Sequence, residues 1–159
     1  MKRACTEEQV NIRKEEIINT VSKMFDEMDY QNISMKTISE KISIARSSLY
    51  CYYNSKEEIM LDVLKNDYIK FLKTIIEDFE KKDTIEELTD NITDAYMNNL
   101  RVMKIISLYL TDIEIHCSLG SLVNFKKDFV TYMLDLKKSI CKRFNNLSEK
   151  ESLIIYNSL

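Results

Sequence analysis

The residues with the most chemistry to offer lie close together, in the stretch ISIARSSLYCYYNSKEEIM at positions 42–60. Positions 46–56 within it hold Arg46, Ser47, Ser48, Tyr50, Tyr52, Tyr53 and Lys56. Cationic and hydroxyl side chains are hydrogen-bond donors that suit phosphate oxygens and the edges of bases. The stretch is therefore either the surface of a short helix that lies on a negatively charged partner, or a tyrosine-rich end of a helical hairpin.

The composition restricts the elements that can carry these residues. The chain has 159 residues, a single glycine (Gly120) and no proline, so it lacks the turn residues that hairpins and β-folds need. An all-α fold follows, with enough residues for a core that needs no metal or disulfide. No apolar stretch follows the N-terminus and no run of eighteen apolar residues occurs, so we expect a cytoplasmic protein without a membrane span. The cysteines show no CxxC spacing and are expected to be reduced thiols: Cys5, Cys51, Cys117 and Cys141.

Charge is distributed unevenly along the chain. The net charge is -3, but residues 1–56 carry nine Lys and Arg against eight Asp and Glu, or +1, and residues 57–159 carry fourteen against eighteen, or -4. Positive charge thus lies toward the N-terminal third. For binding an anionic partner, local clustering on one face matters more than this small difference in the total.

Start signals and apolar periodicity divide the chain into helices. Thr6, Ser55, Thr84 and Ser148 are each followed three residues later by Glu or Gln, which is the pattern of a capping box. Helical spacing of apolar residues then predicts helices at about 7–28, 35–41, 46–53, 56–81, 84–99, 100–115, 121–145 and from 148 onward, with a loop at 118–120. The end of the sequence is apolar and has no stop signal, which leaves open whether the last helix is short or the polypeptide is truncated.

Two short helices joined by a tight apolar turn and braced by a longer helix before them form a helix-turn-helix, whose second helix enters the major groove of DNA. The residues that form a recognisable pattern here are Ile17, Ile18, Met24 and Phe25 in the first helix, Tyr30 at its close, Ser34, Met35 and Ile38 in the second, and Ile44, Leu49, Tyr50, Tyr53, Ser55, Lys56 and Glu57 in the turn and reading helix. On these residues, and without a gap, the stretch 13–59 resembles the N-terminal domain of the TetR family of transcriptional regulators.

The sequence departs from the family pattern in the turn. Ser43 stands where the family usually has glycine, and Ala45 stands where it usually has a Ser or Thr that caps the reading helix. Loss of that cap costs about 1 kcal/mol of local helix stability, unless Ser43 substitutes for it.

The resemblance implies a three-helix helix-turn-helix DNA-binding domain at residues 1–56 and a helical domain for ligand binding and dimerisation at 57–159. Arg46, at the start of the reading helix, is expected to read bases, since its guanidinium can bond two acceptors of a guanine. Ten residues are expected to contact DNA, most of them at its sugar-phosphate backbone: Ser34, Lys36, Thr37, Ala45, Arg46, Ser47, Ser48, Tyr50, Tyr52 and Lys56.

The resemblance also implies a homodimer that binds an inverted-repeat operator in double-stranded DNA, most often as a repressor released by a small apolar or aromatic effector. Apolar stripes of this kind are core more often than ligand site, and the candidate walls for the effector pocket are Tyr96, Met97, Met103, Tyr109, His116, Phe125, Phe129, Tyr132 and Met133. His116 is next to Cys117, but one His-Cys pair lacks the ligand spacing of a zinc site, so we expect neither metal nor cofactor.

The sequence also bears on two other classes of function. An enzyme is not expected, because the sequence has no glycine-rich phosphate loop, no paired-carboxylate or nucleophile signature and no HExxH. A helical module whose tyrosines bind a protein partner, and which has lost DNA binding, is the remaining alternative. Salt distinguishes the two, because binding through phosphates weakens steeply as salt rises.

Overall fold

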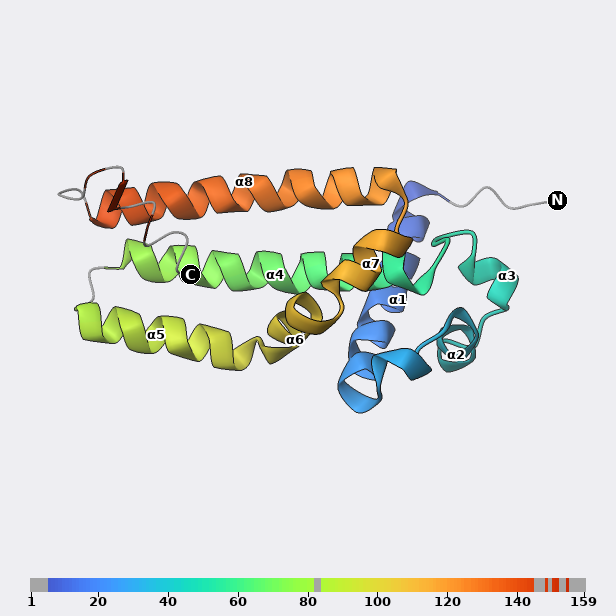
Figure 1. The fold of residues 1–159 in the computed structure, drawn as a ribbon. Coiled ribbons are helices and arrows are strands. Elements are labelled where there is room, and N and C mark those ends of the chain that lie inside the picture. The colour runs from blue at the N-terminus through green and yellow to red at the C-terminus, as the bar shows by residue number, and fades with distance from the viewer. Residues whose placement is uncertain (1–5, 82–83, 145–147, 149, 152–153, 155–159) are drawn as a thin grey trace. The chain divides into compact units, whose positions relative to one another are not determined.

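The computed structural model describes residues 6–81, 84–144, 148, 150, 151 and 154, and within them the regular elements are all helices (Figure 1). In chain order they are α1 (Glu7–Glu27), the 3-10 turn η1 (Tyr30–Asn32), α2 (Met35–Lys41), α3 (Arg46–Leu49), α4 (Lys56–Glu80), α5 (Ile85–Asn98), α6 (Leu100–Leu108), α7 (Leu110–His116) and α8 (Leu119–Arg143). The all-α prediction is confirmed. None of these helices is both long enough and apolar enough to cross a bilayer.

The helices form two compact units. Unit 1 joins residues 1–64 to residues 108–122, and unit 2 joins residues 65–107 to residues 123–159. Unit 1 therefore contains α1 to α3, the first turns of α4, and α7. The division into a DNA-binding domain at 1–56 and a regulatory domain at 57–159 remains a prediction about function.

Capping boxes start the first two helices of unit 1. The Thr6 hydroxyl accepts from the Gln9 N–H at the start of α1, and the Gln9 side chain accepts from the Thr6 N–H. Ser34 and Thr37 form the same reciprocal pair at the start of α2. Each pair satisfies two backbone donors that a helix start otherwise leaves without partners. Side chains at helical spacing are then buried on one face of α1: Ile17, Ile18, Val21, Met24 and Phe25.

Ser43 shapes the turn between α2 and α3. Its φ angle is 55°, in the left-handed region that glycine adopts most easily. The Ser43 N–H bonds the Glu40 carbonyl at 3.2 Å and the Ile44 N–H bonds the Ser39 carbonyl at 3.0 Å. These two bonds close the end of α2 in the way that helices commonly end at a left-handed residue. Ser43 is thus committed to the turn, and the N-cap Ala45 of α3 has no side-chain cap.

Replacing Ser43 by glycine is expected to raise the free energy of unfolding by about 0.5 kcal/mol. The left-handed conformation costs a residue with a Cβ roughly 1–2 kcal/mol, and the greater freedom of glycine in the unfolded chain offsets about 0.5–1 kcal/mol of that gain. Urea unfolding followed by circular dichroism measures the difference. Ser43→Ala is the matched control and should not stabilise; a gain from alanine equal to that from glycine contradicts this account.

Unit 2 is built on α5 and on the parts of α4 and α8 that belong to it, which run beside one another in Figure 1. Its core is a cluster of buried side chains from all three helices: Phe71, Leu72, Ile75, Phe79, Leu88, Ala95, Leu136 and Ile140. The apolar stripe predicted for residues 56–81 supplies four of these side chains, so the periodicity identified the buried face correctly.

Three predicted boundaries were wrong. The helix predicted at 100–115 is two helices, because Tyr109 leaves helical geometry (φ -127°, ψ -11°) and packs its ring against Phe25. Gly120 lies inside α8, whose start is fixed by Ser118: its hydroxyl accepts from the Ser121 N–H at 3.3 Å. The reading helix was predicted to reach residue 53, but α3 ends at Leu49 and a turn continues.

The last predicted helix, from 148, falls mostly outside the described residues, although Ser148 and Glu151 make the bonds of its capping box.

Candidate nucleic-acid interface

Helix α3 presents one polar face from a single turn. Arg46, Ser47 and Ser48 are exposed, while Leu49 is fully buried and attaches the helix to the core of unit 1. This is the arrangement that a reading helix needs, because a buried anchor fixes the orientation of the side chains on the open face.

Arg46 and Tyr50 are paired on the open side of α3. An Nη2 N–H of Arg46 donates to the Tyr50 hydroxyl at 3.0 Å, and the guanidinium carbon lies 5.6 Å from the centroid of the Tyr50 ring. Both side chains are exposed. Residues four apart on a helix share a face, so the pair follows directly from the spacing.

The predicted contacts at the start of α2 are only partly available. The Ser34 and Thr37 hydroxyls are used in the capping box, and the Thr37 hydroxyl also donates to the Ser34 carbonyl oxygen at 3.1 Å. Lys36 is exposed on the first turn, with its Nζ 3.9 Å from Glu40 Oε1. Exposed pairs of this kind are weak, so Lys36 can turn toward a phosphate at little cost.

Lys56 is held inside unit 1. Its side chain is half-buried, Nζ donates to the Tyr30 carbonyl oxygen at 3.2 Å, and the same nitrogen lies 4.0 Å from the centroid of the Tyr30 ring. Tyr52, also half-buried, belongs to the turn after α3. The structure therefore gathers the predicted DNA contacts in unit 1, with Arg46, Ser47, Ser48, Tyr50 and Lys36 the most exposed of the polar ones.

Glu58 links separate segments of unit 1 by hydrogen bonds, a role that was not predicted from the sequence. It is 7% exposed, and its carboxylate accepts from the Asn54 N–H (3.0 Å), the Asn54 side-chain amide (3.2 Å) and the Ser121 hydroxyl (3.2 Å). Burial alone raises the pKa of this carboxyl, but hydrogen bonds from Asn54, Ser118 and Ser121 outweigh it and lower the pKa below the ordinary value. Glu58 thus ties the segment that precedes α4 to the start of α8. The capping-box signal at Ser55 marked Glu58, but only as a partner of Ser55.

Tyr30 is a second residue whose long-range contacts were not predicted from the sequence. Its ring is buried, lies 4.5 Å from the Tyr109 ring centroid and 6.4 Å from that of Phe25, and its hydroxyl donates to Asp112 Oδ2 at 3.1 Å. Burial, the nearby Glu57 charge and the bond to Asp112 raise the pKa of the Tyr30 hydroxyl, so it stays protonated. No sequence signal connects Tyr30 to a residue 82 positions later.

The candidate effector residues do not form one group. Tyr96, Met103, Tyr132 and Met133 pack against the core cluster of unit 2. Buried Phe125 and half-buried Phe129 lie beside each other on α8, with ring centroids 6.1 Å apart. Met97 is 61% exposed. Tyr109 and His116 belong to unit 1, where exposed His116 has Nδ1 3.3 Å from Asp112 Oδ1.

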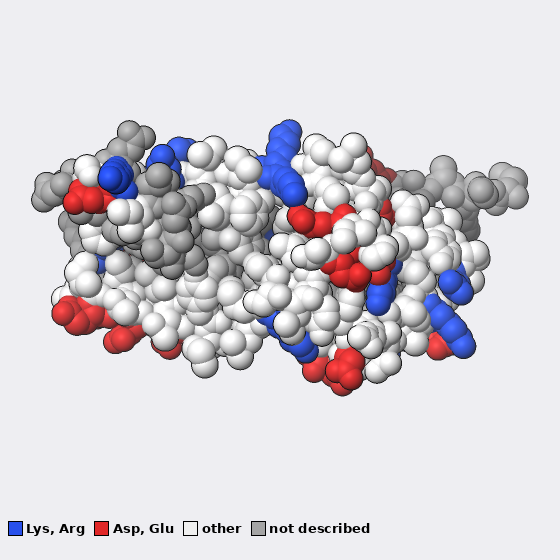
Figure 2. Space-filling view, in the orientation of Figure 1, with Lys and Arg blue, Asp and Glu red and all other residues white. Residues whose placement is uncertain are grey.

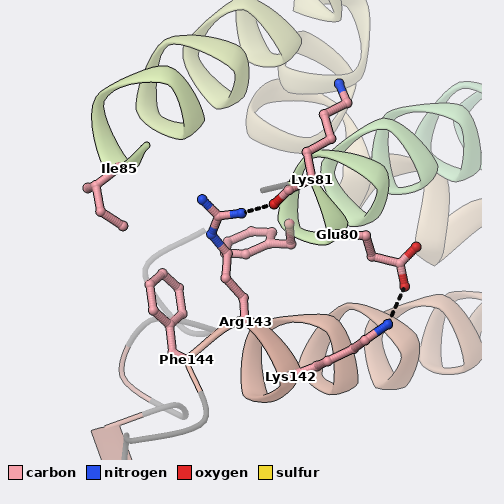
Figure 3. Close-up of a pocket in the computed structure, with 7 residues that line it drawn as sticks. Glu80, Lys81, Ile85, Lys142, Arg143 and Phe144 are labelled. Atoms are coloured by element: carbon pink, nitrogen blue, oxygen red, sulfur yellow. Dashed lines mark hydrogen bonds and ion pairs between the residues drawn. The ribbon is translucent and has the colours of Figure 1, made fainter. Parts of the chain in front are cut away.

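A pocket of about 470 Å³ opens at the ends of α4 and α8 (Figure 3) and contains none of these candidates. Its lining residues are Phe79, Glu80, Lys81, Ile85, Lys142, Arg143 and Phe144. The cations are paired within the protein: Lys142 Nζ lies 4.0 Å from Glu80 Oε1, and Lys81 Nζ lies 2.6 Å from Asp78 Oδ1. Arg143 donates to the Lys81 carbonyl oxygen. The pocket therefore offers a ligand few uncommitted charges.

Charge on the face shown in Figure 2 is mixed in sign. Figure 2 shows Lys and Arg interspersed with Asp and Glu across the visible face. In unit 1, Lys41 Nζ lies 3.7 Å from Glu27 Oε2, which partly neutralises one of the lysines of α2. On the face shown in Figure 2, therefore, an anion would meet a few exposed cations rather than a broad positive field.

A short helix anchored by a buried leucine, preceded by a tight turn and a capped helix, defines a helix-turn-helix protein. Residues 17–63 match the family model described as bacterial regulatory proteins, tetR family. Residues 17–63 of this chain thus carry the N-terminal domain that defines this family.

Similar proteins agree with this assignment. The chain is 36% identical over 62 residues to the uncharacterized HTH-type transcriptional regulator YxbF of Bacillus subtilis, covering 39% of this chain and 16% of the relative. It is 28% identical over 75 residues to the negative regulator of the biofilm operon icaADBC, IcaR, of Staphylococcus epidermidis, covering 47% and 40%. The chain thus spans less than half the length of these relatives. The fatty acid degradation regulator FadR from Bacillus halodurans has a similar fold, with a TM-score of 0.60, 16% identity, and coverage of 92% of this chain and 79% of that chain.

Proposed function

We propose that this protein is a cytoplasmic transcriptional repressor, which binds an inverted-repeat operator as a homodimer through α3. The observation that carries the proposal is the geometry of α3: Arg46, Ser47 and Ser48 are exposed on a helix fixed by fully buried Leu49. Ser34, Lys36, Thr37, Tyr52 and Lys56 are proposed as contacts to the DNA backbone, which position the protein without reading sequence. The name of IcaR describes a negative regulator, which supports the choice of repressor.

Selection of bound fragments from random DNA tests this function. We expect enrichment of an inverted repeat whose half-sites are separated by about one helical turn or somewhat more. Affinity for the enriched site should fall steeply between about 50 and 200 mM salt. Failure to enrich any sequence, together with salt-insensitive capture of a protein partner, would support the helical interaction module instead.

Arg46→Ala is expected to weaken binding to the enriched operator by about 1–3 kcal/mol and to relax preference at one base position per half-site. Lys36→Ala, on the neighbouring helix, should weaken binding to all sequences alike and lower the salt slope by about one unit. Fluorescence anisotropy with the operator and with single-base variants measures both effects. Sequence-blind losses from both variants would contradict base reading by Arg46.

Alkylation of cysteine provides a footprint of the DNA-binding face. Cys51 is exposed in the turn after α3, whereas Cys117 is half-buried, and burial and nearby carboxylates raise the pKa of its thiol to about 12. Because the thiolate is the reactive form, N-ethylmaleimide should label Cys51 at least about tenfold faster than Cys117.

Saturating operator should then slow labelling of Cys51 by about tenfold and leave Cys117 unchanged, which mass spectrometry of a Cys5→Ser, Cys141→Ser protein can follow. Non-operator DNA at the same concentration is the control. Equal labelling of Cys51 with and without operator would place the DNA elsewhere.

The outer face of α8 supports the homodimer. Val123, Val130 and Leu134 are 56%, 53% and 53% exposed and recur at helical spacing. An apolar stripe of this kind on one helix suits packing against a second copy of itself about a two-fold axis. Val130→Asp should convert a dimer to a monomer in sedimentation experiments, whereas the adjacent exposed Thr131→Asp should not; a monomeric wild-type protein would overturn the dimer.

Unit 2 is the proposed place for the effector. A small cavity of about 20 Å³ lies among Tyr68, Phe71, Leu72, Ile75, Tyr96, Met133 and Leu136. A space of this size holds at most one water, so an apolar or aromatic effector must displace these side chains as it binds. Helix α4 contributes residues to both units, so displacement of Phe71 can change the start of the helix in unit 1.

Calorimetry on the free protein and on the operator complex tests the effector. A compound that weakens operator binding by about 1–3 kcal/mol must itself bind the operator complex more weakly by the same amount. Equal affinity for both forms would exclude that compound as an inducer.

A further inference from the structure

The pair formed by Arg46 and Tyr50 lies at the surface through which unit 1 is proposed to read DNA, and this inference rests on that proposed function. Helix α3 is only four residues long, from Arg46 to Leu49, and Tyr50 caps it. The hydrogen bond of 3.0 Å and the ring contact of 5.6 Å therefore join the two ends of the reading helix. Tyr50 is 43% exposed, so the pair lies on the open surface and adds little to the core.

The bond leaves the guanidinium competent for base recognition. A guanidinium has five N–H donors, and the Tyr50 hydroxyl accepts one of them. Two of the remaining donors are enough for the O6 and N7 acceptors of a guanine. The Tyr50 hydroxyl, having accepted from Arg46, keeps its own proton to donate to a phosphate oxygen.

Holding the Arg46 side chain in place before DNA binds also reduces the conformational entropy that it loses on binding. An arginine side chain carries about 2 kcal/mol of rotamer entropy, part of which is lost when its fork docks on a base. A side chain already held by a hydrogen bond and a ring face loses less at that moment.

We infer that Tyr50 is a specificity-determining positioning residue, whose hydroxyl and ring hold the Arg46 guanidinium in place for a guanine in each half-site. The two neighbouring tyrosines do not share this role. The buried Tyr53 donates its hydroxyl to Asp62 Oδ2 at 2.8 Å, and Tyr52 is half-buried in the following turn. Tyr52 is thus the natural control for Tyr50.

Tyr50→Phe removes the hydroxyl and keeps the ring, and Tyr52→Phe makes the same chemical change two residues away. Both full-length proteins are assayed against the best operator and against an operator in which the base pair read by Arg46 is changed. For Tyr50→Phe we expect the ratio of the two affinities to fall about fivefold. Tyr52 is proposed above as a contact to the DNA backbone, so any loss from Tyr52→Phe falls on both operators alike and the ratio stays unchanged. Melting curves of all variants confirm equal folding.

A double-mutant cycle separates positioning from an independent phosphate contact. If Tyr50 acts through Arg46, Tyr50→Phe has no further effect on the ratio in an Arg46→Ala background. The inference is overturned if Tyr50→Phe weakens both operators alike, or if the effects of the two substitutions on the ratio are additive. Absence of any sequence preference in the wild-type protein would remove the proposed function itself, and the inference with it.

Discussion

Tyr30→Ala is expected to lower the free energy of unfolding by about 4 kcal/mol, because truncation of a buried aromatic side chain costs about 3–5 kcal/mol. The Tyr30 ring is 4% exposed and contacts the rings of Phe25 and Tyr109. Its loss opens a cavity between segments that are far apart in the chain. For a chain of this size the melting temperature should fall by roughly 8–16 °C.

Tyr30→Phe is the matched control, since it keeps the ring and removes only the hydrogen bond from the hydroxyl to Asp112. It should cost about 1 kcal/mol, the net contribution of an ordinary hydrogen bond. Urea unfolding of the full chain, followed by circular dichroism, measures both variants. If the two substitutions cost the same, the hydroxyl rather than the ring packing holds this part of unit 1 together.

Glu58→Ala is expected to lower the free energy of unfolding by about 3 kcal/mol. The substitution leaves the Asn54 N–H, the Asn54 amide and the Ser121 hydroxyl without the acceptor that they share. Buried donors without partners cost about 1–3 kcal/mol each where water cannot replace the acceptor. Because Asn54 follows the reading segment, operator binding should weaken as well.

Glu58→Gln keeps the shape and one acceptor, so it should cost less than Glu58→Ala, and it also gives a pH test. The folded-state pKa of Glu58 lies below the value of about 4.3 expected in the unfolded chain, so its stabilisation is present above that value and is lost as the pH falls toward the folded pKa. The difference in stability between wild type and Glu58→Gln should therefore shrink below about pH 4. A difference that is constant with pH would show that the charge of Glu58 is irrelevant.

Local signals predicted local structure well. Thr6 and Thr84, two of the predicted capping residues, start helices α1 and α5 with side-chain bonds three residues away, and such bonds depend only on neighbouring sequence. The open face of α3 was also predictable, since the alternation of Leu49 with polar neighbours fixes which side is buried. The family pattern placed these elements in the correct order.

Long-range packing was not predictable. The break at Tyr109 has no breaker residue in the sequence; its ring packs against Phe25 in unit 1, and that contact overrides helix propensity. At Gly120 a loop was predicted where the structure has a helix, because α8 includes this glycine. A Cβ atom added at Gly120 would have no neighbouring atom within 4 Å, so the position does not require a glycine. The hydrogen-bonded link at Glu58 depends on Ser121, which is 63 residues away. A single sequence carries no signal for such pairs.

The composition of unit 1 from residues 1–64 and 108–122 has a consequence for protein synthesis. A ribosome adds about 5–20 residues per second, so Asp112 emerges roughly 4–16 s after Tyr30, its partner 82 positions earlier. During that interval Tyr30 lacks both the ring of Tyr109 and the carboxylate of Asp112, and Glu58 lacks Ser121. The nascent chain must therefore wait with its reading segment incompletely supported while α5 and α6 are made. A polypeptide released before residue 122 would carry every residue of α3 and still not complete the unit that supports it.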